Sequence, residues 1–308
     1  MTRVYERLVR RPAAFRHMTG MTQTEFEALY WQAAPLLEEE RLERLNARPR
    51  QRAVGGGGQY KNDIRNRLLM GLIWLRIYPI YEVLGFLFDL HKSNVSRNLE
   101  PVLEVLHQLL GDEVAWPDEK QRKKKGMDQF LEEFADVVAI VDATEQPIQR
   151  PQDDETQRRF YSGKKKRHTV KHQIVVTPEG EIIHTGGAAS GSRHDKAMFE
   201  DSGVGDRLEG DEAYMGDKGY QGIQRDCKAV LPHKRPKGGQ LTEEQKAYNS
   251  RLSSVRVVVE HTIGWMKHFR VLAQTYRHPR ESHNRAFEIV AGLVNRRIRR
   301  RRRSVALA

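Results

Sequence analysis

Apolar residues recur every three or four positions in two stretches of the N-terminal third of the chain, a spacing typical of helices. Thr22 and Glu25 stand before the first stretch in the pattern of a capping box. The second stretch runs from about residue 62 to 110. The intervening segment ends in Gly55–Gly58 and has the composition of a linker, since no Gly-Lys-Ser/Thr of a phosphate loop follows it. The apolar positions include Phe26, Leu29, Tyr30, Ala33, Ile64, Leu68, Leu72 and Leu75.

The segment from Ile80 to Leu99 predicts a helix-turn-helix element. After Pro79, a short apolar helix up to residue 88 leads into a polar turn, and Ser93 is expected to cap a second, more polar helix. The polar side chains of that helix are of the types that contact phosphates and base edges. An ordinary pair of helices with a polar surface would give the same pattern. The residues expected on the exposed side are Lys92, Asn94, Ser96, Arg97 and Asn98. The candidate DNA contacts are Lys92, Ser93, Asn94, Ser96 and Arg97.

The periodicity changes from helical to strand-like near residue 136, after a charged segment, residues 118–134, that predicts a helix carrying Lys123–Lys125. Three neighbouring strands followed by alternating helices and strands favour an α/β fold with a mixed sheet flanked by helices. The predicted strands are residues 137–142, a basic strand from Lys164 to 176, residues 181–185 after a hairpin turn at 177–180, the segment of Asp217, and 229–232; the predicted helices are 194–199 and 242–272.

Lys and Arg outnumber Asp and Glu by 53 to 41, which gives a net charge of +12 and favours a polyanion such as nucleic acid as partner. A basic protein without such a partner is the alternative. The Arg296–Arg303 run is expected either to bind phosphates or to act as a solubilising tail. With Cys227 as the single cysteine and no segment long and apolar enough for a signal peptide or membrane span, we expect a cytoplasmic protein that works on the nucleoid if it binds DNA.

Three carboxylates occupy places where an unpaired charge beside a core would be costly. Asp142 follows an apolar run and is expected at the tip of a buried strand, while Asp217 precedes a Gly turn. Glu260 follows three valines inside the long helix, on the same helical face as Arg256 and Lys267. If the three converge, they form a hard-oxygen site suited to Mg²⁺, for which a phosphodiester is the natural substrate of a basic protein.

An ordered set of motifs lies between about residues 137 and 275: Val141–Thr144 with Pro147 and Ile148, Tyr161–Lys166 with His168 and Lys171, Gly191–Asp195, Gly216–Gly222, and Arg256–Glu260 with Gly264 and Lys267. Each motif is weak by itself, whereas the ordered set is specific. The set resembles the DDE transposases of the bacterial insertion-sequence type that are related to eukaryotic Harbinger transposases. The preceding helix-turn-helix segment also resembles the DNA-binding module of that family.

The resemblance implies a ribonuclease-H-like core in which Asp142, Asp217 and Glu260 are the catalytic residues and the metal ligands. Two Mg²⁺ ions, with Mn²⁺ as a substitute, would flank the scissile phosphate, and Asp142 would bridge them. No covalent enzyme intermediate is needed in this chemistry. The phosphate and DNA-channel contacts that follow from the same assignment are Arg256 and Lys267, and Lys164, Lys165, Lys166 and Arg167.

Four other residues bear on this assignment. Asp211 and Glu212 are rival carboxylates near Asp217 in the sequence. His194 and Asp195 are expected to support the site from outside the set of metal ligands, with Asp195 in the first turn of a helix. Related insertion-sequence families carry a Tyr three residues before the Arg of the last motif. Here that position is Ser253, so the phosphate contact of that Tyr is absent or supplied elsewhere.

The expected domains are an N-terminal helical segment with linker at 1–58, a helix-turn-helix domain at 59–116, a catalytic domain at 117–295 and a basic tail at 296–308. The expected function is that of a transposase, which binds terminal inverted repeats, cuts the ends by metal-dependent hydrolysis and joins the 3′-hydroxyls to target DNA. Pairing two ends requires at least a dimer. The alternatives are a DNA-binding derivative that no longer cuts, against which the three retained carboxylates argue, and a metal-dependent nuclease without strand transfer.

Overall fold

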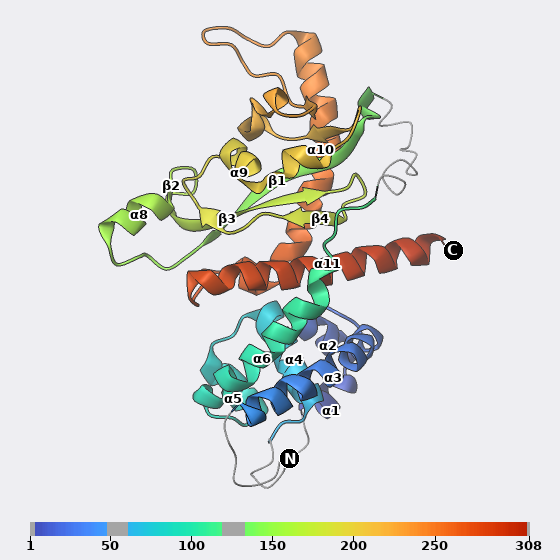
Figure 1. Ribbon diagram of the computed structural model, residues 1–308, viewed down its shortest axis with the longest axis vertical. Coiled ribbons are helices and arrows are strands. Elements are labelled where there is room, and N and C mark those ends of the chain that lie inside the picture. Colours follow the sequence, from blue (N-terminus) through green and yellow to red (C-terminus); the bar gives the residue numbers. More distant parts are fainter. Residues whose placement is uncertain (1–3, 48–60, 119–132, 307–308) are drawn as a thin grey trace. The chain divides into compact units, whose positions relative to one another are not determined.

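The computed structural model describes residues 4–47, 61–118 and 133–306 (Figure 1). The predicted Gly-rich linker and the predicted helix with Lys123–Lys125 lie outside these residues. The chain divides into two compact units. The first comprises Met1–Asp112, Lys267–Gln274 and Arg285–Val290, and the second comprises Glu113–Met266, Thr275–Asn284 and Ala291–Ala308.

The first unit is helical, as its periodicity predicts. Thr22 and Glu25 form the predicted capping box, because the Thr22 hydroxyl accepts from the N–H of Glu25 while the Glu25 carboxylate accepts from the N–H of Thr22. A Cβ on Gly71 would come within 2.5 Å of the Val102 side chain, so the helices that contain these two residues pack closely. The helices are α1 (Val4–Val9), α2 (Pro12–Thr19), α3 (Gln23–Asn46), α4 (Ile64–Ile77), α5 (Tyr81–Phe88) and α6 (Lys92–Gly111), with the 3₁₀ helix η5 (Arg270–Leu272) against α4.

The second unit is built on a seven-stranded mixed sheet, which confirms the predicted fold class of a mixed sheet flanked by helices after a helical N-terminal region. The strand order is β2-β3-β1-β6-β7, with β4 and β5 also paired to β3. β1 is antiparallel to β3 and parallel to β6. The strands are β1 (Val137–Pro147), β2 (Tyr161–Ser162), β3 (Arg167–Val176), β4 (Ile182–Thr185), β5 (Ala189–Ser190), β6 (Ala213–Met215) and β7 (Ala229–Val230).

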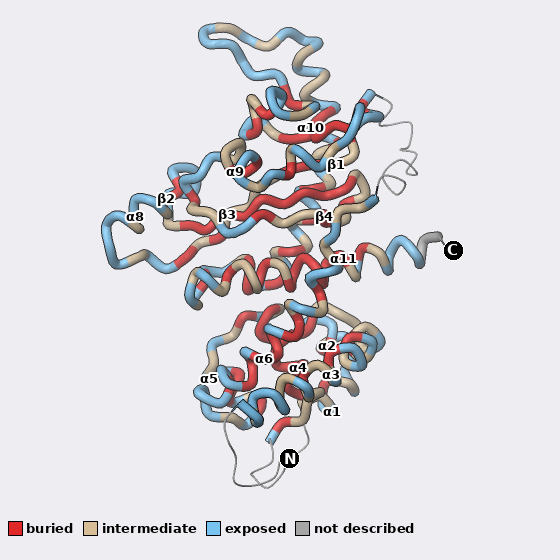
Figure 2. The backbone as a smooth tube through the Cα atoms, in the orientation of Figure 1, coloured by how far each residue is buried: buried red, intermediate tan, exposed pale blue. Residues whose placement is uncertain are grey.

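Helices cover both faces of this sheet. On one face Val141 and Tyr214 pack with Phe199 of α9 (Asp195–Ser202) in a buried apolar cluster. Figure 2 shows long buried stretches, in red, along β3 and β4. On the other face Thr262 of α10 (Glu243–Lys267) donates to the carbonyl of Gly180. The remaining elements are α8 (Asp154–Phe160), α11 (His283–Ala306) and the 3₁₀ helices η2 (Val204–Arg207), η3 (Lys218–Tyr220), η4 (Ile223–Arg225) and η6 (Arg280–Ser282).

Asn295 joins α11 to the sheet edge. Its side-chain amide is fully buried, accepts from the N–H of Ile182, and donates to the carbonyls of Ile182 and Glu113. Each of these backbone groups would cost about 1–3 kcal/mol if left buried without a partner. A single polar residue therefore fixes this part of α11 on β4.

Two strand predictions need correction. Asp142 is not at the tip of a strand, because β1 continues to Pro147 and pairs with β3 along its whole second half. Lys164–Lys166 are exposed and lie in the turn between β2 and β3 rather than in a strand. The turn forms because Lys166 adopts a left-handed conformation with φ of 52° and because the Ser162 hydroxyl accepts from the N–H of Lys165.

The predicted basic tail is part of helix α11, which extends from His283 to Ala306. The long helix that carries Glu260 begins one residue after Thr242, as predicted, and ends at Lys267 rather than near 272. Thr242 caps it together with Gln245. Within the described ranges, no helix has both the length and the apolar character needed to cross a membrane.

A chain of buried side chains links α11 to the sheet through two histidines. His172 of β3 donates from Nδ1 to the carbonyl of Gly186, at 3.0 Å. Its Nε2 lies 2.8 Å from Nδ1 of His283, and the Nε2 of His283 lies 2.7 Å from the Gln146 amide. Burial lowers the pKa of His172 to about 4 and that of His283 to about 3, in the latter case with a further contribution from His172. Both rings are neutral at pH 7.

These histidines are expected to make the fold acid-sensitive. Their pKa values in the folded chain lie below the ordinary value of 6.5, so the unfolded chain binds more protons as the pH falls from 6.5 towards 4. Stability present above pH 6.5 is therefore lost on acidification, by roughly 1–2 kcal/mol per histidine at pH 5. Urea unfolding at pH 7.5 and pH 5 measures the loss, and His283→Gln should reduce it by about one histidine's share.

Asp142 acts in the opposite direction, because its pKa is raised from 3.8 to about 6. The folded chain holds that proton more tightly, so its contribution is present below pH 3.8 and lost as the pH rises through 6. Asp142→Asn removes this contribution and isolates that of the histidines. Equal losses of stability on acidification in native protein and His283→Gln would contradict the prediction.

Candidate active site

Asp142 is a largely buried carboxylate near the middle of the sheet. Its side chain is 18% exposed, Oδ1 accepts from the N–H of Ala143 at 2.8 Å, and Oδ2 lies 3.6 Å from Nη2 of Arg256. Burial raises the pKa of Asp142 to about 6, and the charges of Asp217 and Asp195 add to this. The Ala143 N–H and the Arg256 guanidinium oppose it without cancelling it. The surroundings thus disfavour the ionised form of Asp142, and a bound cation would compensate its charge.

Asp217 follows β6 by two residues and caps η3. Its Oδ1 accepts from the N–H of Gly219 at 2.7 Å. A Cβ placed on Gly219 would lie 2.9 Å from this oxygen and 2.4 Å from Oδ2 of Asp195. The carboxylates of Asp217 and Asp195 thus both approach position 219, where only a glycine leaves enough room. Asp195 begins α9, and Lys171 of β3 pairs with its Oδ1 at 2.6 Å and donates to the carbonyl of Arg193 at 3.2 Å.

Two buried donors beside these carboxylates lack a partner in the described part of the chain. The hydroxyl of Tyr220 and Nε of Arg256 are buried and have no hydrogen-bond partner among the described residues. Burial raises the pKa of Tyr220 well above 10, and the charges of Asp195, Asp142 and Asp217 act in the same direction. Buried donors without partners mark places where a bound group completes the hydrogen bonding. The oxygen-rich donor set fits a hard divalent cation and phosphate oxygens.

Glu260 is exposed on α10, one helical turn after Arg256. The structure therefore brings α10 to Asp142 through Arg256, while Asp142, Asp217 and Asp195 interact electrostatically. In the part of the chain that the structure describes, no three His, Cys, Asp or Glu side chains are already grouped to hold a metal ion. The metal site of Asp142, Asp217 and Glu260 stays a prediction. Lys267 is the last residue of α10.

The structure also gives the surroundings of four other residues that were considered from the sequence. Asp211 has a side chain that is 98% exposed and lies 3.8 Å from Lys228. Glu212 accepts from the N–H of Glu209, so it closes a local turn. His194 is the N-cap residue of α9 but makes no side-chain cap bond, and Ser253 is exposed. None of these four is joined to Asp142 or Asp217 by an interaction that the structure gives for the described residues.

Sequence reasoning assigned no role to Lys171 and Tyr220. Both occur in the quoted motifs, but Lys171 reads as one more basic residue and Tyr220 as a core aromatic. Polar residues surround Lys171 in β3, among them Thr169, His172 and Gln173, so no signal in the sequence marks it as buried. The sequence offers no signal for Tyr220 either, because its hydroxyl meets the carboxylates only in the folded chain.

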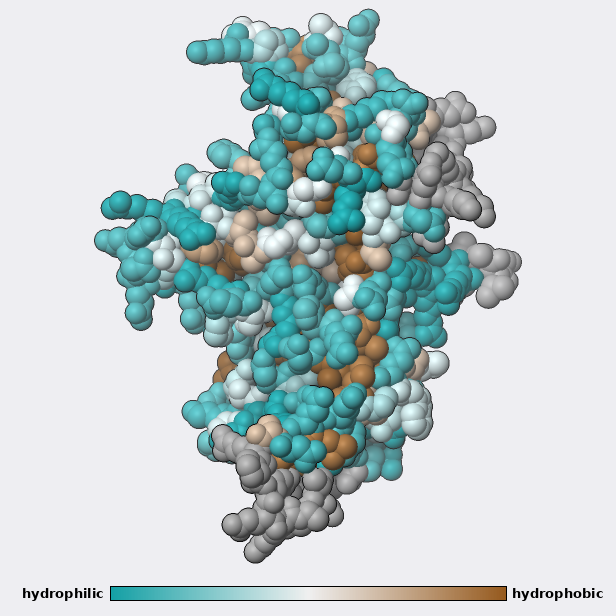
Figure 3. Space-filling view, viewed as in Figure 1, coloured by the Kyte–Doolittle hydropathy of each residue, from teal (hydrophilic) through white to brown (hydrophobic). Residues whose placement is uncertain are grey.

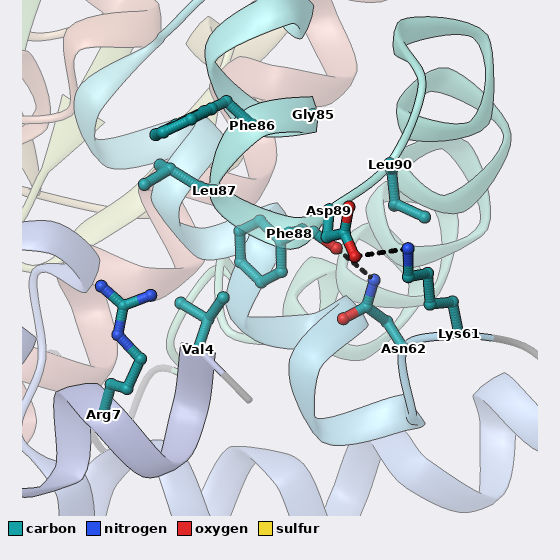
Figure 4. A pocket seen from close by; sticks show the side chains of 10 residues that line it. All are labelled: Val4, Arg7, Lys61, Asn62, Gly85, Phe86, Leu87, Phe88, Asp89 and Leu90. Carbon is teal, nitrogen blue, oxygen red and sulfur yellow. Dashed lines mark hydrogen bonds and ion pairs between the residues drawn. The ribbon is translucent and has the colours of Figure 1, made fainter. Parts of the chain in front are cut away.

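The helix-turn-helix element forms from α5 and α6 in the first unit. Asp89 adopts φ of 53° in the turn, and a Cβ on Gly85 would lie 2.4 Å from the carbonyl oxygen of Leu90, so the turn requires a glycine there. Asn62 donates to the carbonyl of Phe88 at 3.0 Å and Lys61 pairs with Asp89, beside a pocket that Figure 4 shows. Lys61 and Asn62, which precede both helices in the sequence, therefore hold the turn between α5 and α6.

All five predicted contact residues of the second helix are exposed: Lys92, Ser93, Asn94, Ser96 and Arg97. Two details differ from the prediction. His91, not Ser93, is the N-cap of α6, because its Nδ1 accepts from the N–H of Ser93. Asn98 is buried and donates to the carbonyl of Asn94 at 2.7 Å, so it does not belong to the exposed side.

Comparisons with known proteins identify both units. Residues 141–295 match the family described as DDE superfamily endonuclease, and residues 63–112 match the helix-turn-helix of DDE superfamily endonuclease. A protein of Microchaete diplosiphon named as a probable transposase for insertion sequence element IS702 is 30% identical over 282 residues, which cover 91% of this chain and 93% of that protein. No solved structure matches the chain. The chain therefore belongs to the insertion-sequence transposase family, whose members join a helix-turn-helix to a DDE superfamily endonuclease domain, and such endonucleases use divalent metal ions.

Proposed function

We propose that this chain is a transposase that binds the terminal inverted repeats of its own insertion sequence, cuts the ends by metal-dependent hydrolysis and joins the 3′-hydroxyls to target DNA. The observation that carries the proposal is the buried Asp142 on the central strand β1, electrostatically coupled to Asp217 and contacted by Arg256. A helix-turn-helix in the same chain supports a site-specific DNA substrate. The nucleoid would be the place of action.

Asp142, Asp217 and Glu260 would hold two Mg²⁺ ions, with Asp142 shared between them. When bound, the ions lower the pKa of the attacking water and stabilise the departing 3′-oxygen. Asp142 needs no rearrangement of the sheet to do this, because β1 pairs with strands on both sides. Glu260 lies on an exposed helical face and would complete the set when DNA and metal are present.

The chain's own cations would position the DNA. Arg256, with Nε unpaired among the described residues, would hold a phosphate next to the scissile bond. Lys267 would contact a phosphate further along α10. The exposed turn of Lys164–Lys166 lies next to α8, in a region whose surface is mostly hydrophilic (Figure 3), and would line the DNA channel. Asp195, fixed by Lys171, would support the Gly219 turn that carries Asp217.

Transposition requires two ends to be cut and joined together, so at least a dimer would form on paired ends. The Microchaete diplosiphon relative is named a probable transposase, which supports strand transfer over simple hydrolysis. The alternatives are a DNA-binding derivative without cleavage and a nuclease without strand transfer.

Strand transfer separates these alternatives. Purified chain is incubated with Mg²⁺, supercoiled plasmid and duplexes that carry the element's end already cut to a 3′-hydroxyl. The expected product is end DNA covalently joined to plasmid. A matched end that lacks the 3′-hydroxyl should give none, because that hydroxyl is the nucleophile.

Joining that does not depend on the 3′-hydroxyl, or cutting of plasmid without joining, would favour a nuclease without strand transfer. Selective binding of the end duplex with neither cutting nor joining would favour the DNA-binding derivative.

A further inference from the structure

The arginine run at the end of the chain is divided between two sides of helix α11. Arg296 pairs with Glu113 at 2.6 Å, Arg299 pairs with Glu181 at 2.6 Å and also with Glu113, and Arg302 lies 3.4 Å from Glu181. The three arginines are spaced by three residues and so share one side of the helix. The side chains of Glu113 and Glu181 are 19% and 17% exposed. The ion pairs on this side hold α11 to the segments that carry Glu113 and Glu181.

The other side carries arginines that the fold does not use in this way. Arg297 and Arg301 are exposed, and neither forms an ion pair with a carboxylate of the described ranges. Arg303 belongs to the last turn and falls on the side of Arg296 and Arg299. The guanidinium of Arg301 lies 5.7 Å from the ring centre of Trp265, a cation–π contact that orders the side chain and leaves its charge uncompensated. Arg297 and Arg301 are one helical turn apart, where like charges repel each other.

A structural role for the helix dipole does not account for this arrangement. Cations stabilise a helix only within its last turn. Arg297 and Arg301 lie nine and five residues before Ala306, where α11 ends, so both precede the last turn of the helix. Two uncompensated guanidinium groups on neighbouring turns of a helix are instead suited to bind a phosphate backbone.

We propose that the side of α11 formed by Arg297 and Arg301 binds the phosphate backbone of double-stranded DNA without reading its sequence, whereas Arg296, Arg299 and Arg302 hold the helix in place. The inference rests on the proposed function in that DNA is the partner. It assigns a second, non-selective contact surface in addition to the helix-turn-helix. Element ends and unrelated DNA should engage this surface equally, because phosphates carry no sequence information.

The test uses full-length chain with two matched sets of substitutions that remove the same charge. One replaces Arg297 and Arg301 by Gln, and the other replaces Arg296 and Arg299 by Gln. Affinity for an element-end duplex and an unrelated duplex is measured from 50 to 300 mM salt, together with urea unfolding. We expect the first set to lower the affinity for both duplexes about tenfold or more at low salt and to flatten the salt dependence by about 0.9 per lost contact.

The first set should leave the unfolding midpoint unchanged. The second set should lower that midpoint and, under conditions where it is folded, keep the native salt dependence. An unchanged salt dependence in the first set would overturn the proposal, and so would equal flattening in both sets, which would make net charge the only cause. Native preference for the element end over unrelated DNA is recorded in the same titrations. Its absence would count against the proposed function and leave the test of this surface intact.

Discussion

Replacing Asp142 with Asn is expected to slow metal-dependent cleavage about a thousandfold or more while leaving DNA binding close to native. An amide is a much weaker ligand for a hard divalent cation than a carboxylate, and a loss of roughly 4 kcal/mol at the transition state corresponds to this factor. The helix-turn-helix belongs to the other compact unit, so end binding should persist. Single-turnover nicking of an end-bearing duplex measures the first effect, and fluorescence anisotropy measures the second.

Asp211→Asn is the matched control. It removes the same charge from a side chain that is 98% exposed, so native cleavage is expected. Unfolding does not confound the comparison, because the raised pKa of Asp142 means that its ionised form is unfavourable in the fold. Asp142→Asn should be as stable as native chain at pH 7.5. Cleavage within a few-fold of native by a folded Asp142→Asn protein would contradict the assignment of this residue.

Replacing both Asn94 and Arg97 with Ala is expected to abolish most of the preference for the element end. Both are exposed in the first turns of α6, the second helix of the helix-turn-helix, which is the part that reaches base edges in such motifs. A good base contact contributes about 1–3 kcal/mol of discrimination, so two such contacts account for a preference of roughly thirtyfold to ten-thousandfold. Competition between end duplex and unrelated duplex measures the change.

Lys92→Gln provides the contrast. Lys92 is the first residue of α6 and lies 3.2 Å from Glu82, a position suited to a phosphate rather than a base. Lys92→Gln should weaken binding to the end duplex and to the unrelated duplex by a similar factor, smaller than the loss of preference in the double variant. The preference for the element end should remain. If the Asn94 and Arg97 double variant retained native preference, α6 would not be the helix that reads the sequence.

Hydropathy predicted where the sheet begins better than where its strands end. Asp142 was placed at a strand tip because the apolar run stops there, yet β1 continues through polar residues. The continuation is possible because those residues have partners elsewhere. The Glu145 carboxylate accepts from the Thr169 hydroxyl at 2.8 Å, and the Gln146 amide meets His283. A hydropathy pattern cannot register such partners, which lie 24 and 137 residues away in the chain.

The same limit applies to the candidate site. The motifs predicted that Asp142, Asp217 and Arg256 matter, and the structure brings Arg256 to Asp142. The three valines before Glu260 suggested a buried helix, but Val257 is 38% exposed and only Val259 is fully buried. One side of α10 faces the sheet, while neighbouring residues in the sequence point to solvent. An apolar run of three residues does not reveal this difference.

Charge runs were the least informative part of the sequence. The C-terminal arginines read as one basic segment, although Glu113 and Glu181 pair with one side of the helix only. Lys171 likewise reads as a surface charge but lies buried against Asp195. Opposite charges distant in sequence decide these cases, and only the folded chain brings them together.

The most direct test of the three-carboxylate assignment is nicking of duplex DNA that carries the element's ends, with and without Mg²⁺, by native chain and by Asp217→Asn. Mg²⁺-dependent nicking at the end that is lost in Asp217→Asn, with end binding retained, is the predicted result. Nicking that is independent of divalent ions, or that survives in Asp217→Asn at the native rate, would contradict the assignment.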